Sequence, residues 1–338
     1  MNILITGCAG FIGFSLARKF LNLNSEYNII GLDNLNNFYS TKLKKKRLSI
    51  LKKYKNFKFY KLDLLNKNKI RELFNKYNFY AVYHLAAQAG VRYVITHPEK
   101  FIESNIYGFH NLIECVNKSR ISKFFYASSS SVYGDLNKFP VNEKSKLFPK
   151  NIYGLSKKIN EEYVEIHSNK NIKYIGLRLF TVYGEWGRPD MLILKFLDHA
   201  KKNKTFLLNN SGDHWRDFTY IDDVTNILVM LLNKKYNNNE IYNVCSNNPI
   251  LIKDLIKYLK KILNFYKVKN TNSNKFEVYK THGSNAKLKK IINFKKFSNI
   301  YDNIDNVILW YKKYGNLISN VWFAQHIFWQ NYNCNSYI

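Results

Sequence analysis

The amino-terminal half of the chain alternates short apolar runs with longer amphipathic stretches. Asn2–Thr6 is an apolar run of strand length. The stretch behind it repeats apolar residues at the spacing of one helix face, at Phe11, Ile12, Leu16 and Phe20. The same succession recurs, with further strands expected at residues 27–33, 57–63, 80–87, up to 129, and 173–180. Strands that alternate with helices in this way predict an α/β fold with a doubly wound parallel sheet.

The turn between the first strand and the first helix carries three glycines, Gly7, Gly10 and Gly13. Glycine at such a turn lets the backbone approach a pyrophosphate, which then lies against free N–H groups and the positive dipole end of the helix. The second strand ends at Asp33, twenty residues after Gly13, where a carboxylate can bind both hydroxyls of a ribose. This context predicts a Rossmann-type site for NAD, since the 2′-phosphate of NADP would meet a like charge. The alternative is an ordinary tight turn followed by a strand-end acid.

Tyr153 and Lys157 are four residues apart at the start of a predicted helix, so both side chains face the same side. An ammonium beside a phenol favours the phenolate and lowers the pKa of the phenol. Ser129 closes the preceding strand at the end where ligands lie in an open parallel sheet. We therefore predict that Tyr153 takes a proton from a substrate hydroxyl that Ser129 also contacts. Such a step needs a hydride acceptor, and the small residues Ala86 and Ala87 leave room for a cofactor across the sheet.

The pattern changes to shorter elements after Phe180. We expect a loop at residues 182–191, a helix to about 202, a short strand near 206–210, a helix at 222–232 and a strand at 240–244. The last two are expected to return to the first domain. The predicted organisation is an NAD-binding Rossmann domain at 1–180 with returning segments near 213–245, a smaller interleaved α/β substrate-binding lobe at 181–314, and an aromatic tail at 315–338. We expect the tail to form a helix on the lobe or on a partner.

The formal net charge of +29 raises the question of a nucleic-acid partner. Lysine outnumbers arginine 45 to 8, and asparagine, isoleucine and tyrosine are abundant, so a drift in composition explains the charge. The densest basic run, residues 42–61, has ten basic residues and no acid, and its spacing predicts a helix with a solvated face followed by a strand. We therefore expect no specific nucleic-acid partner.

Neither a zinc site nor a disulfide framework is suggested by the scattered cysteines, which are Cys8, Cys115, Cys245 and Cys334. His84 and His214 lack an H-E-x-x-H motif or clustered carboxylates, so we expect packing and loop polarity from them and no metal. The beginning of the chain has no basic region with a cleavage site, and no run of about 18 apolar residues follows. These features predict a soluble, cytoplasmic protein that does not enter a membrane.

Several stretches resemble, in order, those of the extended short-chain dehydrogenases/reductases, and of the nucleotide-sugar epimerases in particular: GCAGFIG, the serine cluster, YGLSK, LRLFTVYGEWGRPDM and WRDFTYIDDV. HLAAQAGVRY, FTVYGEWGRPDM and RDFTYIDD are similar to stretches of bacterial UDP-glucuronate 4-epimerases. The resemblance covers residues 1 to about 314. It implies NAD-dependent epimerisation of a UDP-sugar at C4, UDP-glucuronate to UDP-galacturonate, through a transient 4-keto sugar. We also expect a homodimer.

The resemblance implies a catalytic set of Ser129, Tyr153 and Lys157. It implies that NAD is held at the glycine turn and the strand ends by Gly7, Gly10, Phe11, Ile12, Gly13, Asp33, Asn34, Asp63, Leu64, Ala86, Ala87, Asn105, Tyr153 and Lys157. It places the substrate against Arg92, Ser129, Ser131, Thr181, Arg188 and Arg216. An arginine fork can hold a carboxylate or a phosphate at two points, so these arginines favour an anionic substrate. Arg216 is expected on the diphosphate, and Arg92, Arg188 and Thr181 near the sugar carboxylate; a surface salt bridge is the alternative for Arg92 and Arg188.

The residues after Ser129 distinguish between reactions of the superfamily. Ser130 and Ser131 stand where related dehydratases carry an Asp-Glu pair and related decarboxylases a Glu, which favours epimerisation. Val94 replaces a serine usual in the family, which removes one hydroxyl near the sugar. Ser284 stands where an Asp is customary, so whether residues 275–285 bind the nucleotide stays open. The alternative substrates are UDP-glucose and UDP-N-acetylglucosamine.

Two other classes of protein compete with an enzyme. A catalytically silent NAD-binding regulator predicts a damaged Ser/Tyr/Lys set, whereas Ser129, Tyr153 and Lys157 are all present. A nucleic-acid binder predicts clustered arginines, whereas the basic residues are mostly dispersed lysines.

Overall fold

A seven-stranded parallel sheet forms the centre of the computed structural model, which describes residues 1–338 except 24–25, 91–92, 273–277, 295 and 319–338. The strand order is β10-β6-β5-β4-β1-β2-β3. The strands are β1 (Asn2–Thr6), β2 (Asn28–Asp33), β3 (Phe57–Lys61), β4 (Phe79–His84), β5 (Lys123–Ser129), β6 (Lys173–Leu179) and β10 (Glu240–Val244). The order reverses between β1 and β4, and the crevice at the carboxyl ends of strands at such a point is where ligands bind in open α/β sheets.

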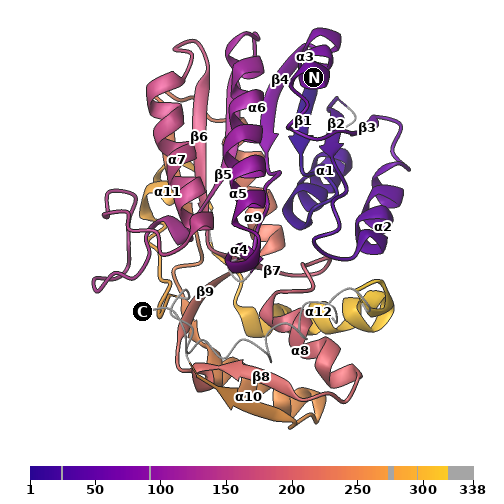
Figure 1. The fold of residues 1–338 in the computed structure, drawn as a ribbon, viewed down its shortest axis with the longest axis vertical. Coiled ribbons are helices and arrows are strands. Elements are labelled where there is room, and N and C mark those ends of the chain that lie inside the picture. The colour runs from indigo at the N-terminus through magenta and orange to yellow at the C-terminus, as the bar shows by residue number, and fades with distance from the viewer. Residues whose placement is uncertain (24–25, 91–92, 273–277, 295, 319–338) are drawn as a thin grey trace.

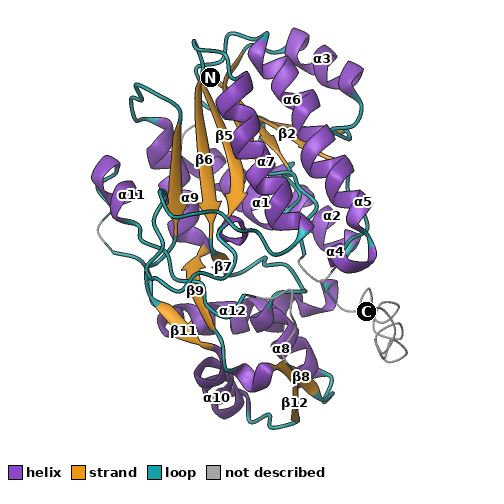
Figure 2. Ribbon diagram, turned by 60° about the vertical axis from the view of Figure 1, so that its left-hand side comes forward, coloured by secondary structure: helices purple, strands orange, loops and turns teal. Residues whose placement is uncertain are grey.

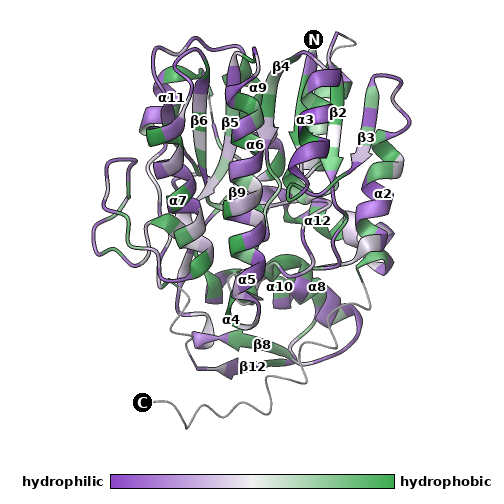
Figure 3. Ribbon diagram, turned by 45° about the horizontal axis from the view of Figure 1, so that its top comes forward, coloured by the Kyte–Doolittle hydropathy of each residue, from purple (hydrophilic) through white to green (hydrophobic). Residues whose placement is uncertain are grey.

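Helices cover both faces of this sheet (Figures 1 and 2). Ile3 and Ile5 of β1 join one buried cluster while Leu4 joins the other, because successive strand residues point to opposite faces. On the first face pack α1 (Phe11–Leu23), α2 (Thr41–Leu51) and α9 (Ile221–Leu232). On the second pack α3 (Lys67–Lys76), α6 (Gly108–Asn117) and α7 (Ile152–His167). Green and purple bands alternate along these helices in Figure 3, as expected of amphipathic helices between core and solvent.

A smaller lobe lies beyond the carboxyl ends of the strands (Figure 1). It contains the three-stranded sheet β11-β9-β7 and the two-stranded sheet β12-β8. These strands are β7 (Thr181–Tyr183), β8 (Phe206–Asn209), β9 (Trp215–Tyr220), β11 (Pro249–Leu251) and β12 (Val268–Thr271). The helices of this part are α8 (Leu192–Lys201), α10 (Ile252–Leu263) and α12 (Ile300–Tyr314), whereas α11 (Ala286–Ile291) contacts β10 of the large sheet.

Several short helical segments lie between the main helices and strands. The stretch before α6 runs through α4 (Tyr93–Thr96), α5 (Pro98–Phe101) and the π-helical η1 (Ile102–Tyr107). A 3₁₀ turn, η2 (Ser130–Val132), follows β5, and another, η3 (Asn210–Gly212), follows β8. The last described turn is η4 (Gly315–Leu317), so the expected tail helix beyond residue 318 lies outside the described residues.

The expected doubly wound parallel sheet is confirmed, with several local corrections. β3 ends two residues and β4 three residues earlier than expected, so Asp63, Ala86 and Ala87 lie in the loops that follow. The loop expected from residue 182 is wrong for 182–183, which pair with β9 as part of β7. Of the segments near 213–245, α9 and β10 join the large sheet and β9 belongs to the small one. The division of domains at residue 180 stays a prediction. No helix among the described residues is long and apolar enough to cross a membrane.

Candidate active site

The glycine turn after β1 is shaped to approach a ligand. Gly7 has a φ of +72°, and a Cβ on Gly13 would lie 2.2 Å from the Gly7 carbonyl oxygen, so neither position accommodates a side chain. The Gly10 N–H donates to the Gly7 carbonyl at 2.9 Å. The backbone N–H groups of Phe11, Ile12 and the third glycine meet no acceptor among the described residues. These are the donors that a helix N-terminus offers to a pyrophosphate, so this turn fits the phosphates of NAD.

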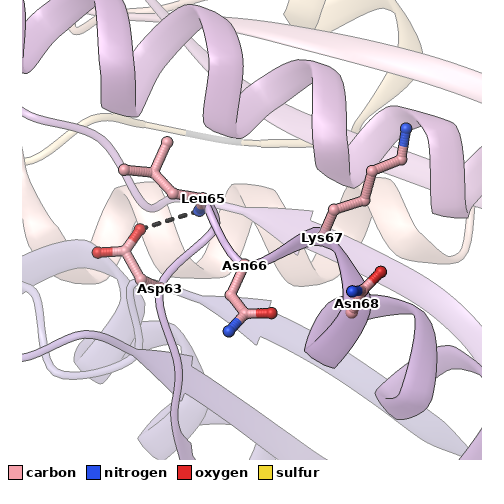
Figure 4. Close-up of a pocket in the computed structure, with 5 residues that line it drawn as sticks. All are labelled: Asp63, Leu65, Asn66, Lys67 and Asn68. Carbon is pink, nitrogen blue, oxygen red and sulfur yellow. Dashed lines mark hydrogen bonds between the residues drawn. The ribbon is translucent and has the colours of Figure 1, made fainter.

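Two carboxylates stand at the ends of the next two strands. Asp33 is buried at the end of β2 and accepts from the backbone N–H groups of Ala9 (3.1 Å) and Leu35 (2.8 Å). Asp63 follows β3 and accepts from Asn34 Nδ2 (2.8 Å) and from the Leu65 N–H (3.0 Å). It borders an open depression at the start of α3, also lined by Leu65, Asn66, Lys67 and Asn68 (Figure 4). Both carboxylates therefore lie at the edge expected for the adenosine part of NAD.

Leu64, Ala86 and Asn105 make structural contacts around this edge. The Leu64 side chain is buried in the core of the second sheet face, and its carbonyl accepts from Asn111 Nδ2 at 2.9 Å. The Ala86 N–H donates to Thr6 Oγ1 at 3.2 Å, and a Cβ on Gly7 would lie 2.7 Å from the Ala86 nitrogen. The loop after β4 thus lies directly against the glycine turn, and the room that Ala86 and Ala87 leave for a cofactor stays a prediction.

Asn105 departs from the expected direct cofactor contact. Its Nδ2 donates to the Gln88 carbonyl (3.0 Å) and to Ser156 Oγ (3.1 Å), and its Oδ1 accepts from the Gln88 N–H (2.8 Å). Both amide protons are therefore used within the protein, which leaves Asn105 no donor for NAD. The residue instead fixes the loop after β4 to α7, from a π-helical segment of the kind often found near functional sites.

Ser129 and Tyr153 meet where β5 and α7 come together. Asn151 caps α7 by accepting from the Gly154 N–H at 2.9 Å. A Cβ on Gly154 would lie 2.5 Å from the Ser131 carbonyl oxygen, so the glycine lets the first turn of the helix contact η2. The Ser129 hydroxyl lies close enough to the Tyr153 hydroxyl to lower the pKa of that phenol, and it accepts from the Ser131 N–H at 3.1 Å. The structure thus brings the predicted pair together.

Lys157 lies on the same helix, and burial dominates the electrostatics of the group. Its Nζ is buried and has no hydrogen-bond partner among the described residues, and burial lowers the pKa of Lys157 to about 8. This unpaired buried amine is near enough to His84, at the end of β4, to affect the pKa of that ring. A buried polar group without a partner is costly, so Lys157 fits a site where a ligand such as the ribose of a nicotinamide nucleotide supplies the partner. The expectation that Lys157 lowers the pKa of Tyr153 is not met here. Burial raises the pKa of Tyr153, and the groups that oppose this are Ser129 and the Arg188 guanidinium.

Arg188 and Thr181 lie together on the lobe side of the site. Both line a small cavity with Phe11, next to the glycine turn. The Arg188 guanidinium is bidentate to Asp190, with Nε at 2.9 Å from Oδ1, and lies 5.7 Å from the centre of the Phe38 ring. This ion pair is the alternative considered for Arg188 from the sequence, although the influence of Arg188 on Tyr153 also places it at the catalytic group. Arg92 lies outside the described residues.

Arg216 lies on β9 beside the last loop of the lobe. Its Nη1 donates to the carbonyls of Trp215 (2.7 Å) and Tyr279 (3.3 Å). The loop at residues 278–285 is fixed at two points by backbone pairing. Lys280 forms an isolated β-bridge with Trp215, and Gly283 forms one with Val141. Ser284, which stands where an acid was expected, donates its N–H to the Val141 carbonyl at 2.8 Å. Residues 278–285 are thus an ordered wall, whereas 275–277 lie outside the described residues.

The two histidines considered as metal ligands do not form a metal site. His84 Nδ1 is 2.9 Å from Thr6 Oγ1, and burial, with a contribution from Lys157, lowers the pKa of His84 to about 3, so the ring is neutral. Its ring stacks on Phe124 at 6.2 Å, which agrees with the expected packing role. Within the described ranges, no group of three His, Cys, Asp or Glu side chains could hold a metal ion.

Sequence reasoning missed two buried cations of α2. The basic run at 42–61 was expected to face solvent, and Lys45 and Lys46 do, but Lys44 and Arg47 are buried. Lys44 Nζ donates to the Asn36 carbonyl (2.8 Å) and Asn36 Oδ1 (2.6 Å), and burial lowers the pKa of Lys44 to about 8. A usable signal was present, because Arg47 is one of only eight arginines and falls on the helix face of Leu43, Leu48 and Leu51.

Comparison with known proteins decides the family. The model of the NAD dependent epimerase/dehydratase family matches residues 3–245. The chain belongs to this family.

It is 36% identical over 323 residues to a UDP-glucuronate 4-epimerase of Thermodesulfobacterium geofontis, covering 94% of this chain and 98% of that protein. Its structure is similar to that of UDP-glucuronic acid 4-epimerase from Bacillus cereus in complex with UDP-glucuronic acid and NAD, with a TM-score of 0.87, 30% identity, and coverage of 93% and 99%. A UDP-glucose 4-epimerase of Thermotoga maritima gives a TM-score of 0.84 at 26% identity, with coverage of 93% and 99%.

NAD is the cofactor of this family member. The residues present fit it at three places: the free N–H groups of the glycine turn, the carboxylate of Asp33 and the unpaired Nζ of Lys157. The family match and the complete Ser129, Tyr153 and Lys157 set argue against a silent regulator on the same fold.

Proposed function

We propose that the protein is an NAD-dependent UDP-glucuronate 4-epimerase that forms UDP-galacturonate. The observation that carries the proposal is that Ser129 and Tyr153 come together at the carboxyl end of β5, with the unpaired Nζ of Lys157 one turn further along α7. The Thermodesulfobacterium geofontis relative is a UDP-glucuronate 4-epimerase and the Bacillus cereus neighbour is a complex with UDP-glucuronic acid, and both are more similar in sequence to this chain than the UDP-glucose 4-epimerase of Thermotoga maritima. Similarity and site chemistry therefore agree on the same reaction.

Tyr153, Ser129 and Lys157 have different roles in the proposed reaction. Tyr153 takes the proton of the sugar 4-hydroxyl, and Ser129 hydrogen-bonds the same oxygen and keeps it against the phenol. NAD, when bound, would supply the acceptor for the C4 hydride and the same hydride for the opposite face of the 4-keto sugar. Lys157 holds the nicotinamide ribose, and its ammonium opposes the effect of burial on Tyr153 once both groups are charged. Tyr153 finally returns the proton to the new 4-hydroxyl, so no net oxidation occurs.

The polar groups of η2 and the lobe support a carboxylate sugar. Ser130 and Ser131 offer hydroxyl groups and no acid, so the group that elimination or decarboxylation needs in this superfamily is absent from these positions. Thr181 and Arg188 lie across from them beside Phe11, and Arg216 lies by the wall formed by residues 278–285. We assign Thr181 and Arg188 to the sugar carboxylate, with Asp190 holding the guanidinium in place, and Arg216 to the diphosphate.

A panel of UDP-sugars tests this proposal. Purified protein should convert UDP-glucuronate to its C4 epimer about ten- to hundredfold more efficiently than UDP-glucose, since one charge-assisted hydrogen bond to the carboxylate is worth roughly 1.5–3 kcal/mol. Tyr153→Phe should lower turnover by on the order of 10²–10⁴ by removing the base, whereas Tyr163→Phe, later on the same helix, should not. Equal use of both sugars would remove the carboxylate assignment and leave UDP-glucose or UDP-N-acetylglucosamine as substrate. Turnover by Tyr153→Phe close to wild type would remove the catalytic assignment.

We also propose a cytoplasmic homodimer. The outer faces of η1 and α7, which contact each other, expose large apolar side chains: Ile102, Tyr107, Leu155 and Ile166. Two copies could bury these faces as a bundle of four helices related by a twofold axis. Light scattering coupled to gel filtration should give twice the chain mass of 40.1 kDa. Free cysteines at positions 8, 115 and 245 agree with a reducing compartment.

A further inference from the structure

Arg47 is a fully buried arginine with an unusual set of partners. Its Nη1 donates to the Ala9 carbonyl (2.8 Å) and to Tyr39 Oη (2.7 Å), and its Nη2 donates to the carbonyls of Trp186 (2.5 Å) and Gly187 (3.1 Å). The side chain is 0% exposed. No ion pair with a carboxylate is found for it among the described residues, so the oxygens that receive its hydrogen bonds are three main-chain carbonyls and the Tyr39 hydroxyl.

The first of these oxygens belongs to the cofactor turn. The Ala9 peptide is held on both sides, because its N–H donates to Asp33 at 3.1 Å while its carbonyl accepts from Arg47. Ala9 directly precedes Gly10 and the free N–H groups at the start of α1. Arg47 therefore fixes the backbone that presents donors to the pyrophosphate.

The other main-chain oxygens belong to the lobe segment that ends at Arg188. Trp186 has a φ of +60°, a left-handed conformation that is costly for a large side chain and persists only when its surroundings enforce it. Its indole packs on Phe14 of α1 (5.3 Å between ring centres) and on Trp310 of α12 (5.4 Å). With the ring held between the two parts of the molecule and the carbonyl held by Arg47, the following residues have a defined path.

We infer that Arg47 is a positioning residue that keeps the 186–188 segment in register with the glycine turn. This inference rests on the proposed function. One planar guanidinium spans both segments, so a shift of either one breaks hydrogen bonds to the other. Without it, three buried carbonyls lose their donor, and Trp186 can relax toward a right-handed conformation. Arg188 and the cavity it lines with Phe11 would then move away from the substrate.

Loss of this register has a specific chemical consequence. In the proposed reaction the hydride passes from C4 to NAD and the hydroxyl proton to Tyr153, which leaves a 4-keto sugar and a reduced nicotinamide. Return of the hydride requires the keto sugar to stay in the site while it rotates to present its other face. If the sugar escapes because the lobe wall is displaced, the nicotinamide remains reduced and that protein molecule stops turning over.

The experiment compares Arg47→Met and Arg47→Lys with wild type, and uses Arg18→Met as a matched control, since Arg18 only covers the Phe14 ring (5.3 Å) of the same aromatic group. We expect Arg47→Met to weaken UDP-glucuronate binding in calorimetry by about ten- to hundredfold. We also expect it to accumulate reduced nicotinamide, seen by absorbance, with the loss of activity during turnover. Arg47→Lys keeps the charge without the planar guanidinium, so both of its measurements should be intermediate between those of Arg47→Met and wild type. Arg18→Met should match wild type in both.

Several outcomes would decide against the inference. If a folded Arg47→Met binds UDP-glucuronate like wild type and accumulates no reduced nicotinamide, Arg47 has only a packing role. If Arg47→Met does not fold, Arg47→Lys decides by the same two measurements. Failure of the proposed function looks different, because wild type itself would then not epimerise UDP-glucuronate. In that case UDP binding and NAD content after gel filtration, neither of which needs turnover, still show whether Arg47 couples the two segments.

Discussion

Burial disfavours the charged forms of both Tyr153 and Lys157 on α7. It raises the pKa of Tyr153 and lowers that of Lys157 to about 8, so each group is pushed toward its neutral form. A phenolate and an ammonium that form together offset this cost through their mutual attraction. The arrangement therefore keeps Tyr153 protonated until a substrate hydroxyl and NAD complete the site.

The buried Lys157 gives stability a predictable dependence on pH. Its pKa is about 8 in the folded protein against 10.5 ordinarily, so the unfolded chain binds more protons between these values. Stability therefore rises with pH across this window, and the part due to Lys157 is roughly 3 kcal/mol. In nucleotide-free protein, Lys157→Met should be more stable than wild type below pH 8, and the difference should shrink toward pH 10.5. Chemical denaturation at several pH values measures this, and a difference independent of pH would show that Lys157 is not buried as a cation.

At the residue scale, the sequence identified chemistry better than contacts. Ser129, Tyr153 and Lys157 could be predicted because their spacing is local and their roles follow from functional groups. The hydrogen bonds of Asn105 could not be predicted, since its partners at Gln88 and Ser156 are 17 and 51 residues away, and its contact with NAD stays a prediction. Arg47 was missed for the same reason, because its carbonyl acceptors lie up to 140 residues further along the chain.

At the scale of elements, the active site depends on how closely α7 approaches η2. Gly154 makes this approach possible, because a Cβ there would lie 2.5 Å from the carbonyl oxygen of Ser131. Backbone atoms on both sides leave little room for adjustment. The contact sets the distance between Ser129 on the strand and Tyr153 on the helix.

Gly154→Ala should therefore separate the catalytic pair. We expect a loss of about 1–3 kcal/mol in the free energy of unfolding from overpacking, together with a fall in kcat. Gly108→Ala is the control, since its Cβ would lie 3.0 Å from the Leu64 Cβ and an ordinary 3.6 Å from the Glu103 carbonyl oxygen, and alanine favours the helix by about 1 kcal/mol. Thermal unfolding and steady-state kinetics of both variants are the measurements. Wild-type kcat in Gly154→Ala would show that the pair does not depend on this contact.

Most elements could be predicted because their signals are local. The large-sheet strands are apolar runs followed by amphipathic helices, and each was placed to within a few residues. β7 has only three residues and is a strand because β9 pairs with it, more than thirty residues later. Neither its existence nor the allocation of β9 to the small sheet follows from hydrophobic periodicity, since both depend on long-range pairing.

At the scale of the whole molecule, a buried polar network connects the site to the far side of the large sheet. Arg178 on β6 is bidentate to Glu161 on α7, with bonds of 2.9 and 2.7 Å, and Ser128 donates to the same carboxylate at 2.5 Å. Arg178 also donates to Tyr133 Oη at 2.9 Å, and Tyr133 donates to Asn243 Oδ1 of β10 at 2.6 Å. One network thus joins β5, β6, β10, α7 and the turn after η2, next to Ser129.

A double-mutant cycle tests whether this network acts as a unit. Glu161→Gln should lower the free energy of unfolding by about 3–5 kcal/mol, because it leaves the Arg178 guanidinium buried without its counter-charge. Arg178→Met should cost a similar amount by leaving the Glu161 carboxylate unpaired. The double variant contains neither charge, so its loss should be smaller than the sum of the two by more than about 1 kcal/mol. Urea denaturation of the four proteins measures the coupling. Losses that simply add would mean that each side chain acts through separate contacts, and Ser129 would then be positioned by β5 and the Gly154 contact alone.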